Sequence, residues 1–251
     1  MVKGVDIFKR YFEGFEDQYA VIGGAACELL FGDAGLAFRA TKDIDMVLCV
    51  EVVNADFATR FRQFIEDGKY EARERSDGHK EFYRFHKPGN DDFPFMIELF
   101  SRVPDGLDFS EGMALAKITV EREIISLSAI LLDEVYYNAL LKARKSVDGV
   151  TILDETLLIP FKAKAFLDLK MRAESGEKID DKNIKKHRND VIRLVQLLPA
   201  DTHIMIDETI IADIAAYLEH IESDETLDPK SFGVDMTRQE TCDLLRTAYR
   251  I

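Results

Sequence analysis

Two aspartates stand two residues apart in RATKDIDMVL, residues 39–48, where a polar stretch becomes apolar. In a β-strand, side chains two residues apart project from the same face, roughly 6.5 to 7 Å apart along the chain. Asp43 and Asp45 are therefore expected to point together while Ile44 faces the other side. Two converging carboxylates repel each other unless a cation lies between them, and Mg²⁺ takes hard oxygen ligands of this kind. The spacing predicts a divalent metal site.

A third carboxylate lies further along the chain, in FMIELF at residues 95–100. Glu98 stands there between Ile97 and Leu99 in a predicted strand, and an acid among apolar neighbours is costly unless it is paired, exposed or metal-bound. If this strand lies beside the first, three carboxylates could hold two ions, which would stabilise the attacking and leaving oxygens of a phosphoryl transfer. The predicted metal ligands are therefore Asp43, Asp45 and Glu98.

Upstream, IGGAACELL places Gly23 and Gly24 between a predicted strand and a predicted helix. Glycine lets backbone N–H groups approach a phosphate closely, and a helix N-terminus adds a favourable partial charge. A Gly-Gly pair alone is usually a simple turn, and an Asp-x-Asp at the end of a strand is usually solvated. Their occurrence together and in this order favours a site for a phosphorylated substrate.

The whole segment, GGAACELLFGDAGLAFRATKDIDMVL, resembles the first motif of the nucleotidyltransferase superfamily, in particular the AbiEii/AbiGii-like nucleotidyltransferase toxins. That motif is a Gly-Gly or Gly-Ser turn, a helix, and then Arg-x-Thr-x-Asp-x-Asp. It is matched here by Gly23, Gly24, Arg39, Thr41, Asp43 and Asp45. The resemblance implies that the two aspartates bind Mg²⁺, that the glycines cradle phosphate, and that Arg39 and Thr41 organise the approach to the metal-binding strand.

The same family places a lysine on a helix after the sheet and an aspartate in a basic helical segment. Lys162 and Lys164 in PFKAKAFLDL are the candidates for the lysine, and Asp190 in KHRNDVIRL is the candidate for the aspartate. Lys162 is preferred because Ala165 completes the pattern Lys-x-x-Ala, and Lys164 is the alternative. The resemblance implies that the lysine contacts the phosphates of the nucleotide and that Asp190 completes the active site. The competing interpretation is an exposed, solvated helix surface.

The elements that must position these residues fall into two parts. Residues 1–152 mix the two kinds of periodicity, with helices predicted at 5–15, 25–31 and 54–68 and strands at 19–24, 44–50, 70–75, 80–87 and 93–102. Residues 153–251 are predicted to be helical, at 154–176, 181–198, 207–221 and 237–249, with Pro160 marking a kink or a first turn. The predicted fold class is α+β, with a nucleotidyltransferase-like mixed sheet and flanking helices in residues 1–152 and a helical domain in residues 153–251.

Composition limits the choice of partners. The net charge of -14 argues against broad coating of nucleic acid, although residues 162–193 hold ten Lys and Arg against six Asp and Glu. No apolar run approaches the ~20 residues of a membrane span, and the N-terminus lacks the apolar core of a secretory signal, so a cytoplasmic location and no membrane partner are expected. Cys27, Cys49 and Cys242 are predicted to be reduced, mostly buried thiols.

The predicted function is a Mg²⁺-dependent nucleotidyltransferase that moves a nucleoside monophosphate from an NTP to an acceptor hydroxyl. The resemblance implies tRNA, another RNA or a protein as acceptor, and a separately encoded cognate antitoxin as partner. Two alternatives remain open: an aminoglycoside-type small-molecule nucleotidyltransferase, whose acidic cleft would attract a cationic drug, and a catalytically idle nucleotide-binding or interaction module.

Overall fold

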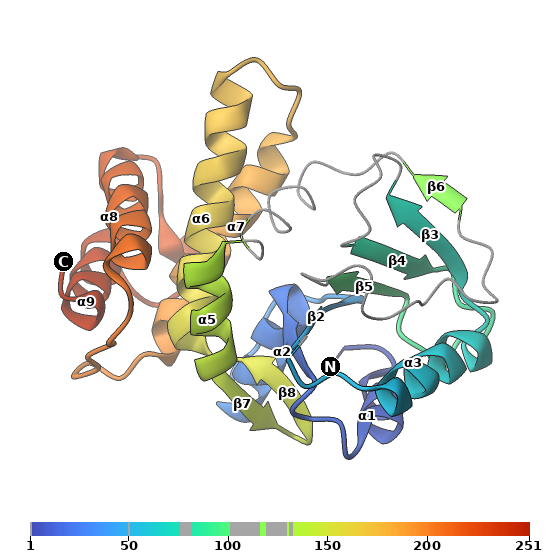
Figure 1. Ribbon diagram of the computed structural model, residues 1–251. Coiled ribbons are helices and arrows are strands. Elements are labelled where there is room, and N and C mark those ends of the chain that lie inside the picture. Colours follow the sequence, from blue (N-terminus) through green and yellow to red (C-terminus); the bar gives the residue numbers. More distant parts are fainter. Residues whose placement is uncertain (1, 50, 76–81, 101–115, 119–129, 131–132) are drawn as a thin grey trace. The chain divides into compact units, whose positions relative to one another are not determined.

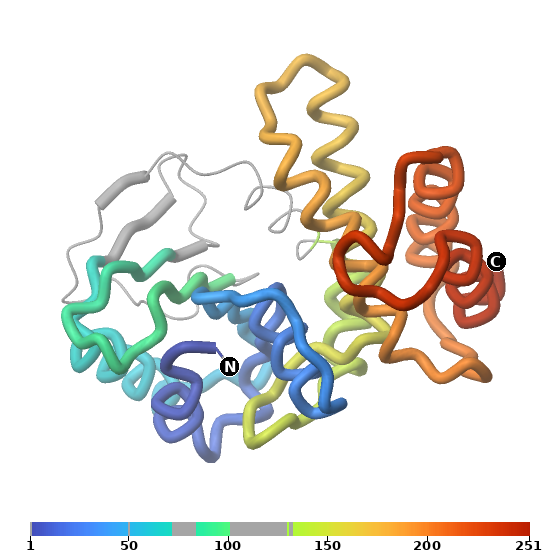
Figure 2. Tube along the Cα trace, turned by 180° about the vertical axis from the view of Figure 1, so that it is seen from behind, coloured from blue at the N-terminus to red at the C-terminus, as the bar shows by residue number. Residues whose placement is uncertain are grey.

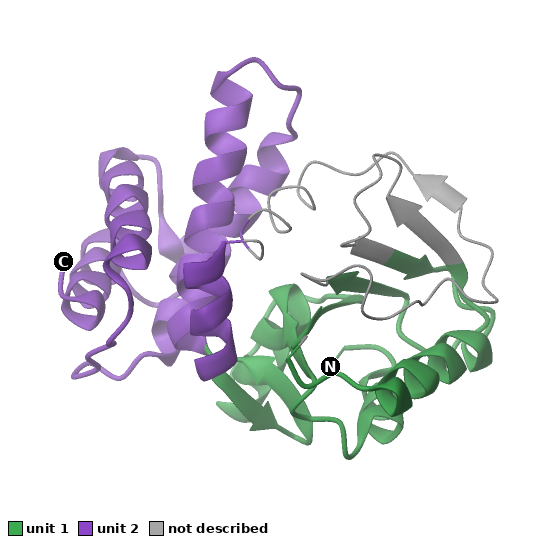
Figure 3. Cartoon of the chain, in the orientation of Figure 1, with its two compact units in different colours: residues 1–120, 144–154 green, residues 121–143, 155–251 purple. Residues whose placement is uncertain are grey.

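The computed structural model describes residues 2–49, 51–75, 82–100, 116–118, 130 and 133–251 (Figure 1). The chain forms two compact units, of which unit 1 comprises residues 1–120 and 144–154 and unit 2 comprises residues 121–143 and 155–251 (Figure 3). The units are not two consecutive segments, because helix α5 (Glu134–Lys142) belongs to unit 2 although it precedes the last two strands of unit 1. The division into domains at residue 152 stays a prediction.

Unit 1 contains a mixed sheet, which confirms the α+β fold class (Figure 1). Its described strands are β1 (Tyr19–Ile22), β2 (Asp43–Leu48), β3 (Glu71–Arg75), β4 (Phe82–His86), β5 (Met96–Phe100), β6 (Ala116–Ile118), β7 (Arg144–Val147) and β8 (Val150–Leu153). Their order across the sheet is β6-β3-β4-β5-β2-β1-β8-β7, and the pairs β2–β5, β1–β8 and β3–β6 are parallel. The strand that bears the two aspartates is thus central.

An aromatic core holds helices α1 (Val5–Phe12) and α3 (Ala55–Asp67) on one face of this sheet. Phe8 of α1 packs edge-on against Tyr19 of β1, with ring centroids 5.5 Å apart, and Phe61 of α3 packs against Phe85 of β4 at 5.3 Å. The side chain of Asn54 caps α3 as predicted, accepting a hydrogen bond from the Phe57 N–H. Edge-to-face aromatic pairs add to the stabilisation that burial already gives.

Strands β7 and β8 form a hairpin that the periodicity did not predict. The turn consists of Asp148 and Gly149, and both have positive φ, 48° and 76°. This is the geometry of a type I′ turn, for which Asp-Gly is a preferred pair. The sequence Val-Asp-Gly-Val was therefore an available signal.

Unit 2 is helical, as predicted for the C-terminal part. Besides α5, its described α-helices are α6 (Glu155–Glu174), α7 (Asp181–Leu194), α8 (Glu208–Ser223) and α9 (Arg238–Tyr249), with 3₁₀ turns at Val195–Leu197 and Pro229–Phe232. Helices α6 and α7 form a hairpin, drawn in gold in Figure 2. None of the described helices is both long and apolar enough to cross a membrane.

Pro160 lies inside α6 and not in its first turn, which corrects one of the two predictions made for it. A proline has no N–H to donate to the carbonyl four residues earlier, which here belongs to Thr156. The hydroxyl of Tyr249, at the end of α9, donates to that carbonyl oxygen at 2.8 Å. The carbonyl that Pro160 leaves without its helical partner is therefore satisfied by a side chain from the last helix.

Candidate functional site

Asp43 and Asp45 begin the central strand β2 and lie on one of its faces. Both are half-buried, whereas Ile44 between them is only 1% exposed. Ile44 pairs in register with Ile97, which pairs with Phe85, so this row belongs to the face that α3 covers. The alternation of a strand places the two aspartates on the opposite face.

Glu98 lies beside Asp45, because β2 and β5 are parallel neighbours and these two residues are in register. The next residue across the sheet is Arg84 of β4, whose Nε and Nη2 donate to Glu98 Oε1 at 2.9 and 2.6 Å. Burial raises the pKa of Glu98 well above its usual value, the negative charge of Asp45 and a hydrogen bond with it raise it further, and Arg84 opposes the rise. Negative charge is thus crowded along this row.

The Gly23–Gly24 turn passes directly against the Asp45 carboxylate. Helix α2 (Gly23–Asp33) begins there, and Gly23 has a positive φ of 67°. A methyl group on Gly23 would overlap the Asp45 carboxylate, and one on Gly24 would stand 2.9 Å from Thr41 Oγ1 and 3.7 Å from an Arg39 guanidinium nitrogen. Only hydrogen fits at either position without a shift of these side chains, so the glycines let the start of α2 lie directly against Asp45 and Thr41.

The loop that carries Arg39 and Thr41 is attached to the same helix. The Thr41 N–H donates to the carboxylate of Glu28 in α2 at 3.3 Å, and the Arg39 guanidinium lies 5.2 Å from the ring centre of Phe38. The structure therefore brings together Gly23, Gly24, Arg39, Thr41 and Asp45, and Asp43 begins the same strand two residues before Asp45. The sequence reasoning missed Glu28 and Arg84, since each is recognisable only from the neighbour that it contacts.

The predicted cluster of three metal ligands is not assembled as the side chains lie. Across the described residues, no three His, Cys, Asp or Glu side chains stand close enough to hold a metal ion. Glu98, the predicted third ligand, is held by Arg84. Asp43 and Asp45 together with the glycine cradle still fit Mg²⁺, because this ion commonly uses one or two carboxylates and completes its coordination with water and substrate phosphate.

The predicted residues of unit 2 form a cluster of their own. Lys162 Nζ of α6 lies 3.3 Å from Asp190 Oδ2 of α7, and Arg193 Nη1 lies 3.4 Å from Asp190 Oδ1. Lys162 is 5% exposed and Asp190 is fully buried. The structure thus pairs the two residues that the resemblance selected, while the catalytic roles implied for them stay predictions.

Lys164, the alternative to Lys162, has different surroundings. Its Nζ donates to Asp213 Oδ2 of α8 at 2.8 Å and lies 4.7 Å from the ring centre of Tyr136. The Tyr136 hydroxyl donates to the same carboxylate oxygen, also at 2.8 Å. The side chain of Lys164 therefore connects α6 with α5 and α8.

The positive charge of residues 162–193 is largely balanced within unit 2. At least six of its ten cations form ion pairs: Lys162, Lys164, Lys170, Arg172, Arg188 and Arg193. Two of the partners, Asp213 and Asp224, lie outside the segment, so they were not part of the local charge count. The excess of positive charge counted in residues 162–193 is therefore smaller once the charges around them in the folded unit are included.

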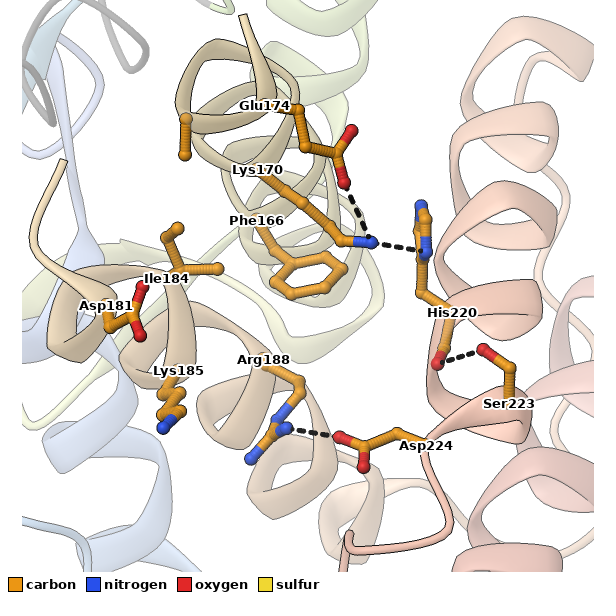
Figure 4. A pocket seen from close by; sticks show the side chains of 11 residues that line it. Phe166, Lys170, Glu174, Asp181, Ile184, Lys185, Arg188, His220, Ser223 and Asp224 are labelled. Carbon is orange, nitrogen blue, oxygen red and sulfur yellow. Dashed lines mark hydrogen bonds and ion pairs between the residues drawn. The ribbon is translucent and has the colours of Figure 1, made fainter. Parts of the chain in front are cut away.

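A pocket of about 410 Å³ between α6, α7 and α8 shows this balance in detail (Figure 4). Lys170 Nζ lies 3.3 Å from Glu174 and 3.1 Å from His220 Nδ1, and Arg188 donates to Asp224 at 2.6 Å (Figure 4). Its lining contains three cations, Lys170, Lys185 and Arg188, and three anions, Glu174, Asp181 and Asp224. The pocket has no surplus of either charge.

No protein-family model and no curated protein matches this chain. Among solved structures, an antigenic nucleotidyltransferase-like protein from Paracoccidioides brasiliensis is similar at 15% identity and a TM-score of 0.47, over 98% of this chain and 91% of that one. The antibiotic-resistance factor ANT(2'')-Ia is similar at 12% identity and a TM-score of 0.40, over 89% of this chain and 95% of that one.

Proposed function

We propose that the chain is a Mg²⁺-dependent nucleotidyltransferase that transfers a nucleoside monophosphate from an NTP to an acceptor hydroxyl. One observation carries the proposal: the Gly23–Gly24 turn at the start of α2 packs against Asp45, Thr41 and Arg39. A structural turn does not need two carboxylates on an adjacent strand, and two carboxylates on the same face of a strand repel each other. A phosphate and its metal ion account for both features.

Each residue of this site has a role in the proposal. Asp43 and Asp45 hold Mg²⁺, which when bound offsets the charge of the triphosphate. The backbone N–H groups at the start of α2 and the Arg39 guanidinium bind phosphate oxygens. Arg84 holds Glu98 and keeps part of the negative charge of this row compensated.

The reaction is an in-line displacement at the α-phosphorus. The acceptor oxygen forms a new P–O bond, its proton passes to a carboxylate oxygen of the site, and the bond to pyrophosphate breaks. The protein contributes mainly orientation and compensation of charge, since phosphoryl transfer needs little covalent chemistry from side chains.

Two acceptors are proposed. The resemblance to AbiEii/AbiGii-like toxins supports RNA, commonly tRNA, together with a cognate antitoxin. The net charge of -14 and the pairing of at least six of the ten cations in residues 162–193 support a small cationic acceptor of the aminoglycoside type.

The test supplies each of the four NTPs, labelled at the α-phosphate, with Mg²⁺ and either total tRNA or a panel of aminoglycosides. Transfer of label to one class of acceptor with release of pyrophosphate identifies that acceptor. The double variant Asp43→Asn/Asp45→Asn should release no pyrophosphate, whereas Glu66→Gln, an exposed acid on α3, should behave as the wild type. Wild-type protein that binds NTP and releases no pyrophosphate with any acceptor would favour the idle-module alternative.

A further inference from the structure

A second pocket, of about 380 Å³, lies on unit 1. Its lining comes from α1, from α3 and from the segment before β5: Ile7, Arg10, Tyr11, Arg60, Gln63 and Phe93. Residues three or four apart share one side of a helix, so Ile7, Arg10 and Tyr11 form one wall and Arg60 and Gln63 form another. Phe93 is only 4% exposed and supplies an apolar floor.

This pocket is separate from the candidate active site. Tyr19 of β1 contacts Phe8 of α1, and Ile22 of the same strand pairs in register with Asp45. Residues three apart in a strand project from opposite faces. Helix α1 therefore covers the face opposite to Asp45, and the pocket beside it belongs to that side of the sheet.

The pocket carries positive charge in a strongly acidic chain. None of its six lining residues is acidic, and two are arginines. Within residues 2–49, 51–75, 82–100 and 133–251, the side chains of Arg10 and Arg60 make no hydrogen bond or ion pair. Elsewhere Arg84 and Arg188 each donate to a carboxylate at 2.6 Å. The guanidinium groups of this pocket are thus available as donors.

Both arginines influence Tyr11, whose ring contacts Phe93 at the floor of the pocket. The Tyr11 hydroxyl donates to Asp67 at 2.6 Å, which engages that carboxylate, and the Tyr11 ring lies 6.0 Å from that of Phe93. Burial and then Asp67 raise the pKa of Tyr11, whereas the charges of Arg60 and Arg10 oppose the rise. Both guanidinium charges therefore act at the Tyr11 hydroxyl.

We infer that this pocket binds a phosphate monoester, with its phosphate on Arg10 and Arg60 and its organic group against Ile7, Tyr11 and Phe93. The fork of a guanidinium matches two phosphate oxygens, and two guanidinium charges offset the two charges of a monoester. The Gln63 amide is a further donor. An apolar or aromatic substituent is expected because half of the lining is aliphatic or aromatic.

The direct test is calorimetric titration of phenyl phosphate into the full-length protein without Mg²⁺. We expect saturable binding at one site, tighter than that of inorganic phosphate, which lacks the ring. Arg10→Gln/Arg60→Gln should weaken it at least about tenfold, since two charged contacts are lost. Arg250→Gln, an exposed arginine at the end of α9, is the matched control and should change it less than twofold. Unaltered binding by the double variant, or no saturation with wild-type protein, would overturn the inference.

Two further variants separate this site from the proposed active site. Arg10→Lys/Arg60→Lys keeps the charge and loses the fork, so intermediate affinity is expected. Asp43→Asn/Asp45→Asn should lose pyrophosphate release and keep the affinity for phenyl phosphate. If that variant alone lost the binding, phosphate would be bound at β2 and the inference would be wrong. Arg10 and Arg60 are exposed, so their replacement should leave the melting temperature unchanged, which a thermal scan checks.

Discussion

Around Asp190 in unit 2, one buried carboxylate lies between two cations, Lys162 and Arg193. Around Asp45 in unit 1, carboxylates from two neighbouring strands, Asp45 and Glu98, lie side by side in register, and Arg84 pairs with Glu98. The first cluster is held together by pairing of opposite charges. The second places two like charges side by side next to a glycine turn, and like charges repel each other.

The difference is one between a cluster of opposite charges and a cluster of like charges. Removing one partner from a buried pair leaves an uncompensated charge, which is strongly destabilising. Removing one charge from a group of like charges relieves repulsion. The same kind of substitution should therefore have opposite effects on stability in the two clusters.

The largest expected effect is the loss of activity in Asp45→Asn. A metal ion supplies several kcal/mol of transition-state stabilisation, so release of pyrophosphate should fall by about 10³-fold or more. The melting temperature should stay within a few degrees of the wild type or rise, because a carboxylate beside Glu98 is removed. Kinetics and a thermal scan of the same preparation provide both values. Unchanged turnover would contradict the metal assignment.

Asp190→Ala should show the opposite pattern in unit 2. It leaves Lys162 buried without its partner and should destabilise the protein by about 3–5 kcal/mol. Thermal unfolding followed by circular dichroism measures this change. Lys162→Met/Asp190→Leu replaces the pair by apolar groups and should recover most of the stability. If the double variant regains stability and remains inactive, the cluster has a role in activity as well.

Addition of Mg²⁺ should stabilise the wild-type protein, with a smaller change in free energy than the one expected for Asp190→Ala. An ion that binds only the folded state stabilises it by RT ln(1 + [L]/Kd), about 2.7 kcal/mol at a hundredfold excess over Kd. The melting temperature of the wild type should rise with Mg²⁺, and that of Asp43→Asn/Asp45→Asn should not. Asp190→Asn serves as the control in unit 2 and should respond as the wild type does. If Mg²⁺ raised the melting temperature of Asp43→Asn/Asp45→Asn as much as that of the wild type, the ion would bind at another site.

The smallest expected effect is on the rate at which a thiol reagent labels the buried cysteines. Because they lie in different units, this rate measures the local unfolding of each unit separately. Cys27 and Cys49 are buried in unit 1, and Cys242 is buried in unit 2. Burial raises the pKa of Cys49 and of Cys242 to about 11, so at pH 8 roughly one of these thiols in a thousand is ionised. Labelling with a thiol reagent should be slow in native protein and complete in denaturant. Asp190→Ala should accelerate the labelling of Cys242, read by mass spectrometry of the digested protein, more than that of Cys49.

Much of the fold could be predicted from local pattern. The periodicity of Val5, Phe8 and Phe12, the Asn54 cap and the alternation in β2 identified helices and strands that the structure contains. The β7–β8 hairpin and α5 were missed. The hairpin signal is only two residues long, and α5 groups with helices that lie far from it in the sequence.

The candidate site was predictable as a set of residues but not as a set of contacts. The spacing of Gly23, Gly24, Asp43 and Asp45 selected the turn and the strand that meet in unit 1. Glu28 and Arg84 became apparent only through their contacts with Thr41 and Glu98. Glu98, the predicted third member of the carboxylate cluster, is in contact with Arg84 of β4, and no spacing in the sequence specifies a neighbour across a sheet.

The sequence by itself determined which residues repeat at helical or strand spacing, that two aspartates share a face, and that a glycine turn precedes them. These properties follow from backbone geometry over a few residues. Only the tertiary structure decided which charges are compensated, because ion pairs such as Lys162–Asp190 and Lys164–Asp213 join residues 28 or more positions apart. Coulomb energy depends on distance in space and on burial, and neither quantity can be read from the order of residues along the chain.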